Sequence, residues 1–141
     1  MSNQPPLKKL SAWYSSLTRA SLDDIAQFYA ADAYFKDPFN EVTGRDLIKN
    51  IFVHMFASTQ QPRFVIMDML EQGDAAFLTW KFLFTLRGRD YTVLGSSHFR
   101  FNQQGLVVFH RDYWDAAEEL WQKLPIIGWL VKWLRRRFAV K

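Results

Sequence analysis

The sequence predicts a single α+β domain in which helices cover one face of an antiparallel sheet. Apolar residues recur at helical spacing up to about residue 57, and the pattern changes to a period of two after Pro62. The chain has 141 residues, of which 49% are hydrophobic, and this is the size of one well-packed domain. Helices followed by hairpin-linked strands are the order typical of the α+β class.

The N-terminal part is expected to hold three helices, at residues 7–20, 22–30 and about 45–57. Ser21 is a suitable cap for the second helix, because its hydroxyl can accept a hydrogen bond from a free N–H at the helix start. A short aromatic strand follows the second helix and ends at Asp37. It ends there because Pro38 cannot continue a strand ladder and holds the preceding residue in an extended conformation.

Four strands are expected at residues 63–71, 75–87, 91–102 and 106–115. The turns between them contain Gly73, Gly88 and Gly105 and have the lengths of hairpin turns. The chain therefore divides into one domain at residues 1–115 and a basic, amphipathic helical extension of it at residues 116–141.

Charge and composition limit the partners and the location of the protein. Residues 1–115 carry 12 Lys and Arg against 12 Asp and Glu, so the whole net charge of +4 comes from residues 116–141. A neutral body with one basic end argues against nucleic-acid binding. The chain has no cysteine, which excludes disulfides and thiolate chemistry. Its polar first residues, and the lack of an apolar run of about 18 residues, favour a cytoplasmic protein.

Asp37 is the first candidate for a catalytic residue. It stands at a strand end between Phe35 and Phe39, where an apolar wall would suit a general base. The alternative is a solvated aspartate in an ordinary turn.

Two motifs carry a resemblance to a known family. Asp37-Pro38 after residues 28–33 (FYAADA), and residues 98–102 (HFRFN) before the Gly105 turn, resemble the bacterial ketosteroid isomerases. More broadly, residues 10–114 are similar to the nuclear transport factor 2-like superfamily, which includes SnoaL-like polyketide cyclases and limonene-epoxide hydrolases. The resemblance implies a cone-shaped barrel, in which a strongly bent, mostly antiparallel sheet wraps around three N-terminal helices and an apolar cavity opens at one end. The extension at 116–141 lies beyond it.

The resemblance to the isomerases implies three catalytic positions. It places the general base at Asp37 and the two oxyanion donors, a tyrosine and a protonated aspartic acid in that family, at Trp13 and Ser97. Tyr14 lies one residue from the tyrosine position. An indole N–H and a serine hydroxyl are weaker donors than the groups they replace, so true ketosteroid isomerase activity is not expected.

The last expected strand adds two polar residues. His110, Asp112 and Trp114 share one face of that strand. The resemblance places this face in the cavity with three further residues expected to contact a ligand, Trp80, Phe82 and Phe99. His110 would then be a general acid/base, and Asp112 would orient it or deprotonate a water. The alternatives are a polar pair that only joins strands, a bulge that turns both residues outward, and a cavity filled by its own aromatic rings.

The extension combines a large apolar surface with clustered cations at Lys132, Arg135, Arg136 and Arg137. We expect it to pack on its own domain or on a second copy, and the alternative is peripheral contact with an anionic membrane surface. A homodimer is also expected because the outer sheet face carries apolar residues such as Phe77, Leu83 and Tyr113.

The expected function is that of a small-molecule enzyme or binder with an apolar cavity for a steroid-, polyketide- or lipid-like ligand. Its chemistry would be of the isomerase, cyclase or hydrolase type without a cofactor, and no His, Asp or Glu has the spacing of a metal site. The alternative is a non-catalytic module of the same fold that binds a ligand or a protein.

Overall fold

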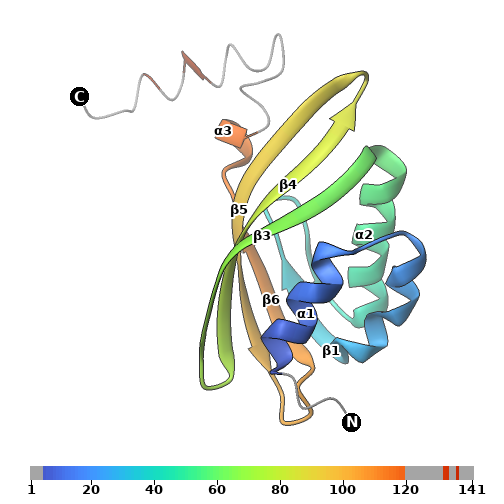
Figure 1. Ribbon diagram of the computed structural model, residues 1–141, viewed down its shortest axis with the longest axis vertical. Coiled ribbons are helices and arrows are strands. Elements are labelled where there is room, and N and C mark those ends of the chain that lie inside the picture. The colour runs from blue at the N-terminus through green and yellow to red at the C-terminus, as the bar shows by residue number, and fades with distance from the viewer. Residues whose placement is uncertain (1–4, 120–131, 134–135, 137–141) are drawn as a thin grey trace.

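The computed structural model describes residues 5–119, 132–133 and 136. Its centre is a six-stranded sheet with the strand order β2-β1-β6-β5-β4-β3, and the helices α1 and α2 lie on one side of this sheet (Figure 1). Neighbouring strands are antiparallel except for β1 and β6, which are parallel. The strands β2 and β3 are the two edges of this mixed sheet, so it does not close on itself, and the arrangement is consistent with the expected cone.

The four strands predicted after Pro62 are present. They are β3 (Gln60–Gln72), β4 (Ala75–Leu86), β5 (Arg89–Phe101) and β6 (Val107–Tyr113). The turn between β4 and β5 has a positive φ at both Arg87 (52°) and Gly88 (77°). This geometry belongs to the two-residue hairpin turns whose twist matches that of the flanking strands.

The N-terminal helices differ from the prediction. The helix α1 (Pro6–Ser15) ends before residue 20, and the second expected helix is a 3₁₀ stretch, η1 (Ala20–Gln27). Thr18 and Ser21 exchange hydrogen bonds, each hydroxyl accepting the other residue's backbone N–H at 2.8 and 3.0 Å. In a continuous helix these N–H groups would donate to carbonyls four residues earlier. Here side-chain hydroxyls accept their hydrogen bonds instead, so the helix ends before them. The N-terminal part therefore holds two α-helices and a 3₁₀ stretch, not three α-helices.

The chain joins the sheet earlier than expected. The strand β1 (Tyr29–Lys36) begins directly after η1, because the carbonyl of Phe28 already accepts a hydrogen bond from Val107 of β6 at 2.8 Å. The short strand β2 (Glu41–Thr43) pairs with the end of β1 where a loop was expected, and α2 (Arg45–Ser58) follows it.

The hydrophobic core lies between the helices and the inner face of the sheet. Leu10 and Tyr14 of α1 and Ile48 and Phe52 of α2 pack there against inward-facing aromatic residues of the strands. The inner rows of β4 and β5 alternate with outward-facing residues, as expected for strands with one buried face.

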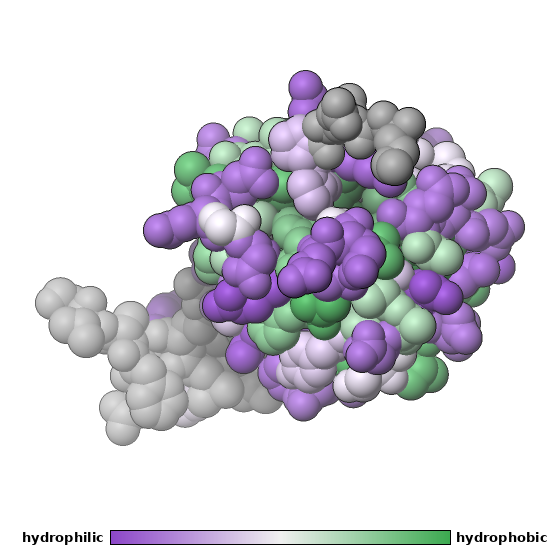
Figure 2. Space-filling model, turned by 90° about the horizontal axis from the view of Figure 1, so that it is seen from below, coloured by the Kyte–Doolittle hydropathy of each residue, from purple (hydrophilic) through white to green (hydrophobic). Residues whose placement is uncertain are grey.

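Apolar residues also reach the surface. On the face seen from below, apolar patches lie between polar residues (Figure 2). Phe77 and Tyr113 are both 46% exposed on the outer sheet face, and Phe77 stacks on His98 with ring centroids 4.4 Å apart. The homodimer expected from this face stays a prediction.

Only part of the C-terminal extension can be described. The short helix α3 (Ala116–Glu119) begins it, and Glu119 accepts a hydrogen bond from the backbone N–H of Leu94 at 3.2 Å. The two helical segments expected at 116–124 and 126–138 otherwise lie mostly outside the described residues. Within the described part of the chain, no helix has the length and apolar character needed to cross a membrane.

Gly95 provides a test of the packing between β4 and β5. A Cβ atom at this position would lie 2.4–2.9 Å from the Trp80 ring, which is 5% exposed. We expect Gly95→Ala to lower the free energy of unfolding by about 1–3 kcal/mol, because the buried indole must move. This loss exceeds the gain of about 0.4–1 kcal/mol that Gly→Ala brings by restricting the unfolded chain.

Urea denaturation of Gly95→Ala, Trp80→Phe and the double variant measures this effect. Since phenylalanine lacks the second ring of tryptophan, Gly95→Ala should cost less in the Trp80→Phe background. An equal cost in both backgrounds would show that Trp80 does not fill the space above Gly95.

Candidate functional site

Two neighbouring strands place polar side chains in the apolar interior. His110 and Asp112 lie on the inner face of β6, and Ser97 of β5 is the register partner of Asp112. His110 is 2% exposed and Ser97 is 3% exposed. Buried polar groups of this kind must be hydrogen-bonded, because an unpaired one costs free energy.

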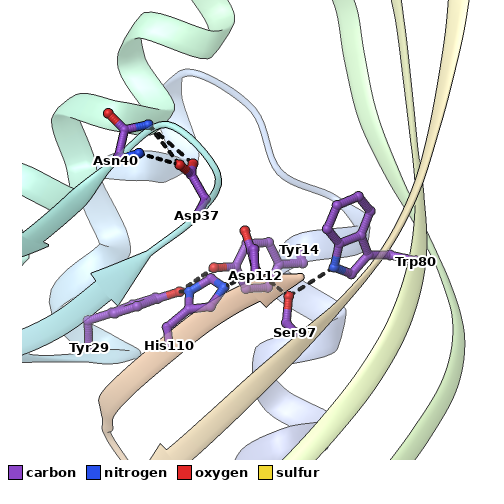
Figure 3. A network of polar contacts seen from close by, with 8 residues as sticks. All are labelled: Tyr14, Tyr29, Asp37, Asn40, Trp80, Ser97, His110 and Asp112. Carbon is purple, nitrogen blue, oxygen red and sulfur yellow. Dashed lines mark hydrogen bonds and ion pairs between the residues drawn. The ribbon is translucent and has the colours of Figure 1, made fainter. Parts of the chain in front are cut away.

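The carboxylate of Asp112 collects hydrogen bonds from both strands (Figure 3). Its Oδ1 atom accepts one from the Ser97 hydroxyl and lies 2.5 Å from His110 Nε2, the same distance as from Ser97 Oγ. The indole N–H of Trp80 donates to Ser97 Oγ at 2.9 Å. Two contacts therefore fix Asp112 Oδ1, one with His110 and one with Ser97. Ser97 is itself held by the hydrogen bond from Trp80.

Two tyrosines continue this network behind the histidine. His110 Nδ1 lies 2.7 Å from the hydroxyl oxygen of Tyr29, which in turn is hydrogen-bonded to the hydroxyl of Tyr14. We call the six linked side chains the buried hydrogen-bond chain: Tyr14, Tyr29, His110, Asp112, Ser97 and Trp80. They come from α1 and from four different strands.

The direction of the protons follows from counting donors and acceptors. Tyr14, Tyr29 and a neutral His110 supply three protons for three contacts, those of Tyr14 with Tyr29, Tyr29 with His110, and His110 with Asp112. Each proton then finds one acceptor, with Tyr14 donating to Tyr29, Tyr29 to Nδ1, and Nε2–H to the carboxylate. A charged imidazole would add a fourth proton and leave a buried phenol hydrogen without a protein acceptor among the described residues, which costs about 1–3 kcal/mol.

Burial keeps both phenols protonated. It raises the pKa of Tyr14 well above its usual value of 10.0, and the neighbouring Tyr29 and the negative charge of Asp112 act in the same direction. Burial also raises the pKa of Tyr29, against a smaller opposing effect of its hydrogen bond with Tyr14. Both hydroxyls are therefore hydrogen-bond donors at neutral pH.

Three hollows meet at Asp112. The inner cavity has a volume of about 240 Å³, the outer groove about 550 Å³, and the deep recess only about 10 Å³. The outer groove is lined by Lys36, Asp37, Pro38, Arg111, Asp112, Tyr113, Trp114 and Asp115. The deep recess is lined by Tyr14, Phe52, Phe64, Ile66, Leu78, Trp80, Ser97, Phe99, His110 and Asp112. The inner cavity is lined by Phe35, Asp37, Phe39, Asn40, Ile51, Phe52, His54, Met55, Phe64, Trp80, Phe82, Phe84, Val93, Asp112 and Trp114.

The second carboxylate oxygen of Asp112 is unpaired among the described residues. Within the described residues, Oδ1 takes both hydrogen bonds of this carboxylate, so Oδ2 has no protein partner. No buried side-chain nitrogen or oxygen of the described residues lacks a partner, and the Asp112 side chain is 17% exposed. Oδ2 is therefore open to whatever occupies the cavity.

Asp37 lies on the same cavity but outside the buried hydrogen-bond chain. Its Oδ1 accepts hydrogen bonds from the backbone N–H groups of Phe39 and Asn40 at 2.8 and 2.6 Å, and from the Asn40 side chain at 3.1 Å. The turn between β1 and β2 holds this carboxylate against Asn40 (Figure 3). Asp37 lines both the inner cavity and the outer groove. Asp37 thus combines the two readings of the sequence, a turn aspartate and a cavity residue.

The oxyanion position assigned to Trp13 does not face the cavity. Its indole N–H donates to the carbonyl of Ser21 at 3.1 Å, and its ring stacks on Phe28 with centroids 4.6 Å apart. Tyr14, one residue later, points to His110 instead. Trp13 is therefore turned away from the side of α1 that carries Tyr14, since consecutive helix residues differ by about 100° of rotation, and an oxyanion role for it stays a prediction.

The other expected ligand contacts divide between two hollows. Trp80, Phe82 and Trp114 line the inner cavity, whereas Ser97 and Phe99 line the deep recess. Sequence reasoning missed Tyr29, since residues 22–30 were taken as a helix. Tyr29, Ala33 and Phe35 are all buried, but Ala31 is exposed and the register shifts between Tyr29 and Tyr34, so period-two alternation could not have found Tyr29.

Metal ligation has no support in the described residues. Nowhere among them do three or more His, Asp or Glu side chains form a group that could hold a metal ion.

The two buried phenols predict a loss of stability at high pH. Because their pKa is raised on folding, the folded state holds these protons more tightly than the unfolded state. The resulting stabilisation is present below about pH 10 and is lost as the pH rises further, with a slope of up to about 2.7 kcal/mol per pH unit for two groups.

Urea unfolding at pH 9, 10 and 11 measures this slope. The double variant Tyr14→Phe/Tyr29→Phe should have a smaller slope than the wild type, and Tyr113→Phe, which removes a half-exposed phenol, should keep it. Equal slopes in the wild type and the double variant would contradict the burial of both protons.

Comparisons with known proteins identify the family and the fold. The family model described as SnoaL-like domain matches residues 10–110. A search of curated protein sequences found no match.

Three solved structures share the fold. A protein of Catenulispora acidiphila with a ketosteroid isomerase-like fold, in complex with trimethylamine, has 18% identity and a TM-score of 0.69 over 79% of this chain and 88% of its own. An epoxide hydrolase of the LEH type from M. tuberculosis has 14% identity and a TM-score of 0.69 over 82% of this chain and 86% of its own. A protein of Jannaschia sp., provisionally described as a SnoaL-like polyketide cyclase, has 12% identity and a TM-score of 0.70 over 84% and 93%. These similarities establish the fold, and with the family match over residues 10–110 they show that the chain belongs to the SnoaL-like domain family of the nuclear transport factor 2-like superfamily.

Proposed function

We propose that this protein is an enzyme that carries out cofactor-free acid/base chemistry on a small apolar ligand, with Asp112 as the general base. The observation that carries the proposal is the asymmetry of the Asp112 carboxylate. Oδ1 is held by Ser97 and His110, while Oδ2 has no partner among the described residues and Asp112 lines an aromatic cavity.

Such a carboxylate is positioned for proton transfer. Oδ2 would take a proton from a ligand carbon next to a carbonyl, and the electron pair of that C–H bond would move to the carbonyl oxygen to give an enolate. Return of the proton to carbon regenerates the carboxylate, so no oxidant or cofactor is required. His110 and Tyr29 would act as positioning residues that fix the plane of the carboxylate.

Asp37 is less suited to this role, although the sequence indicated it first. Three N–H contacts from its own turn fix Oδ1, and Asn40 Nδ2 also lies 3.2 Å from Oδ2. We assign Asp37 to ligand binding at the cavity entrance. The remaining expected contacts, Trp80, Phe82 and Trp114, would hold the apolar part of the ligand.

Ketosteroid isomerase activity is still not expected. The N–H of Trp13 and the hydroxyl of Ser97 both donate to protein acceptors, and the Tyr14 hydroxyl is paired with Tyr29. These groups are therefore not available to stabilise an enolate oxygen, a contribution that is typically worth about 10²–10³ in rate for each donor.

The size of the hollows limits the ligand. The inner cavity of about 240 Å³ is smaller than the roughly 300–1,000 Å³ common for drug-sized ligands. A polyketide- or steroid-like molecule would therefore extend into the outer groove. Relatives described as a polyketide cyclase and an epoxide hydrolase support chemistry of this general class on the same fold.

Deuterium exchange into the bicyclic ketone 2-tetralone, followed by proton NMR in D₂O, tests the base directly. The wild type should accelerate the exchange of the protons next to the carbonyl. Asp112→Asn should lower this rate by about 10²–10⁴, since it removes the base but keeps an oxygen that accepts from Ser97. Asp32→Asn, an exposed aspartate of β1 outside the cavity lining, is the matched control and should keep the wild-type rate.

Exchange at the wild-type rate in Asp112→Asn would contradict the proposed role. An absence of protein-dependent exchange in the wild type, together with measurable binding of the ketone, would favour the alternative of a non-catalytic ligand-binding module. That alternative has some support in the lack of a free oxyanion donor noted above.

A further inference from the structure

We propose that the inner cavity selects ligands that carry a positively charged ammonium group on an apolar body, with Asp37 holding the charge. This inference rests on the proposed function, because it names a ligand class for the same cavity. It is carried by two independent features, the charge of the lining and its aromatic surface.

The described lining of the inner cavity is acidic. It contains the carboxylates of Asp37 and Asp112 and no Lys or Arg. Its one histidine is His54 of α2, whose Nε2 lies 3.2 Å from the Ser58 hydroxyl, so no lysine or arginine among these residues offsets the two negative charges. A neutral ligand would leave both carboxylates without a counter-charge inside a largely apolar space, and an anionic ligand would be repelled.

Two cations, Lys36 and Arg111, line the outer groove. Lys36 and Arg111 are register partners on β1 and β6. Lys36 forms an ion pair with Glu41 at 2.7 Å, and the Arg111 guanidinium lies 4.8 Å from the ring centre of Tyr113. Both side chains line the outer groove, so a ligand that passes from the groove into the cavity leaves the lysine and the arginine behind while Asp37 and Asp112 still line its surroundings.

The aromatic surface supplies the second feature. Phe39 and Trp114 meet edge to face at the cavity with ring centroids 5.5 Å apart, and Asp37 lines the same space. Deeper in, Phe64 packs edge to face on Trp80 at 5.7 Å. Cations within about 6 Å of an aromatic face are attracted by the ring electrons, and cages of aromatic rings are a recurrent means of binding quaternary ammonium groups.

The two carboxylates then have separate tasks. The turn fixes Asp37 in one orientation at the junction of groove and cavity, where it would pair with the ammonium group. Asp112 would stay available for proton transfer, because its hydrogen bonds with the described residues all use Oδ1 and the residue lines all three hollows.

The test compares two ligands of nearly equal shape that differ in charge, choline and its uncharged carbon analogue 3,3-dimethylbutan-1-ol. Titrations of the full chain, followed by NMR at low ionic strength, should show choline binding at least about tenfold more tightly. Benzyltrimethylammonium, which adds an apolar ring, should bind more tightly than choline.

Variants locate the charge. Asp37→Asn keeps the side-chain oxygen that accepts the turn hydrogen bonds, so the fold of the turn should persist. This substitution should weaken the binding of benzyltrimethylammonium about tenfold and leave the affinity for 3,3-dimethylbutan-1-ol unchanged. Asp32→Asn also removes one negative charge, but from an exposed position of β1, and should change the affinity for neither ligand.

Equal binding of choline and its carbon analogue would overturn the inference, as would unchanged cation binding in Asp37→Asn or no binding of either cation up to about 10 mM. These outcomes are separate from those of the proposed function. If Asp112→Asn loses deuterium exchange but the wild type does not prefer cations, Asp112 remains the proposed base and only the proposed ligand class is contradicted. If the wild type prefers cations but does not accelerate exchange, the cavity is a binding site and the proposed enzymatic function is contradicted.

Discussion

The site depends on one buried carboxylate oxygen, Oδ1 of Asp112. Two contacts converge on it at 2.5 Å, from Ser97 and His110, and each of these residues is almost fully buried. Their burial is tolerated because the carboxylate satisfies their polar atoms, and Tyr29 and Trp80 satisfy the remaining ones. Removing the carboxylate would leave the neighbours unpaired in an apolar interior, so the network specifies one arrangement of β1, β4, β5 and β6.

The same interaction links the fold to the proposed chemistry. The parallel pairing of β1 with β6 brings Tyr29 to His110, although 81 positions separate them in the sequence. Because the hydrogen bonds of this chain end on Oδ1 of Asp112, Oδ2 of the same carboxylate has no partner among the described residues. The sheet also separates charges, with Asp112 on its inner face and Arg111, the next residue along β6, in register with Lys36 on the outer one.

The sequence was sufficient where one local pattern decided the structure. Period-two alternation located β3 to β6, and the alternation along β6 correctly put His110 and Asp112 on one face. It was not sufficient where tertiary contacts override local preference. Residues 22–30 have helical spacing, but the pairing of β1 with β6 draws Tyr29 into the sheet, and the same error concealed its contact with His110. The choice between Trp13 and Tyr14 required knowing the rotation of α1 on the sheet, which depends on packing and not on spacing.

The donor and acceptor count of the buried hydrogen-bond chain puts a proton on Nε2 of His110, directed at Asp112, and leaves Nδ1 to accept from Tyr29. Proton–nitrogen NMR correlation of the His110 ring at neutral pH measures this directly, because protonated and unprotonated ring nitrogens resonate in separate regions. The account predicts a protonated Nε2 and an unprotonated Nδ1 in the wild type, and a mixture of tautomers in Tyr29→Phe, which removes the donor to Nδ1. A wild-type histidine that is doubly protonated, or protonated on Nδ1 alone, would contradict it.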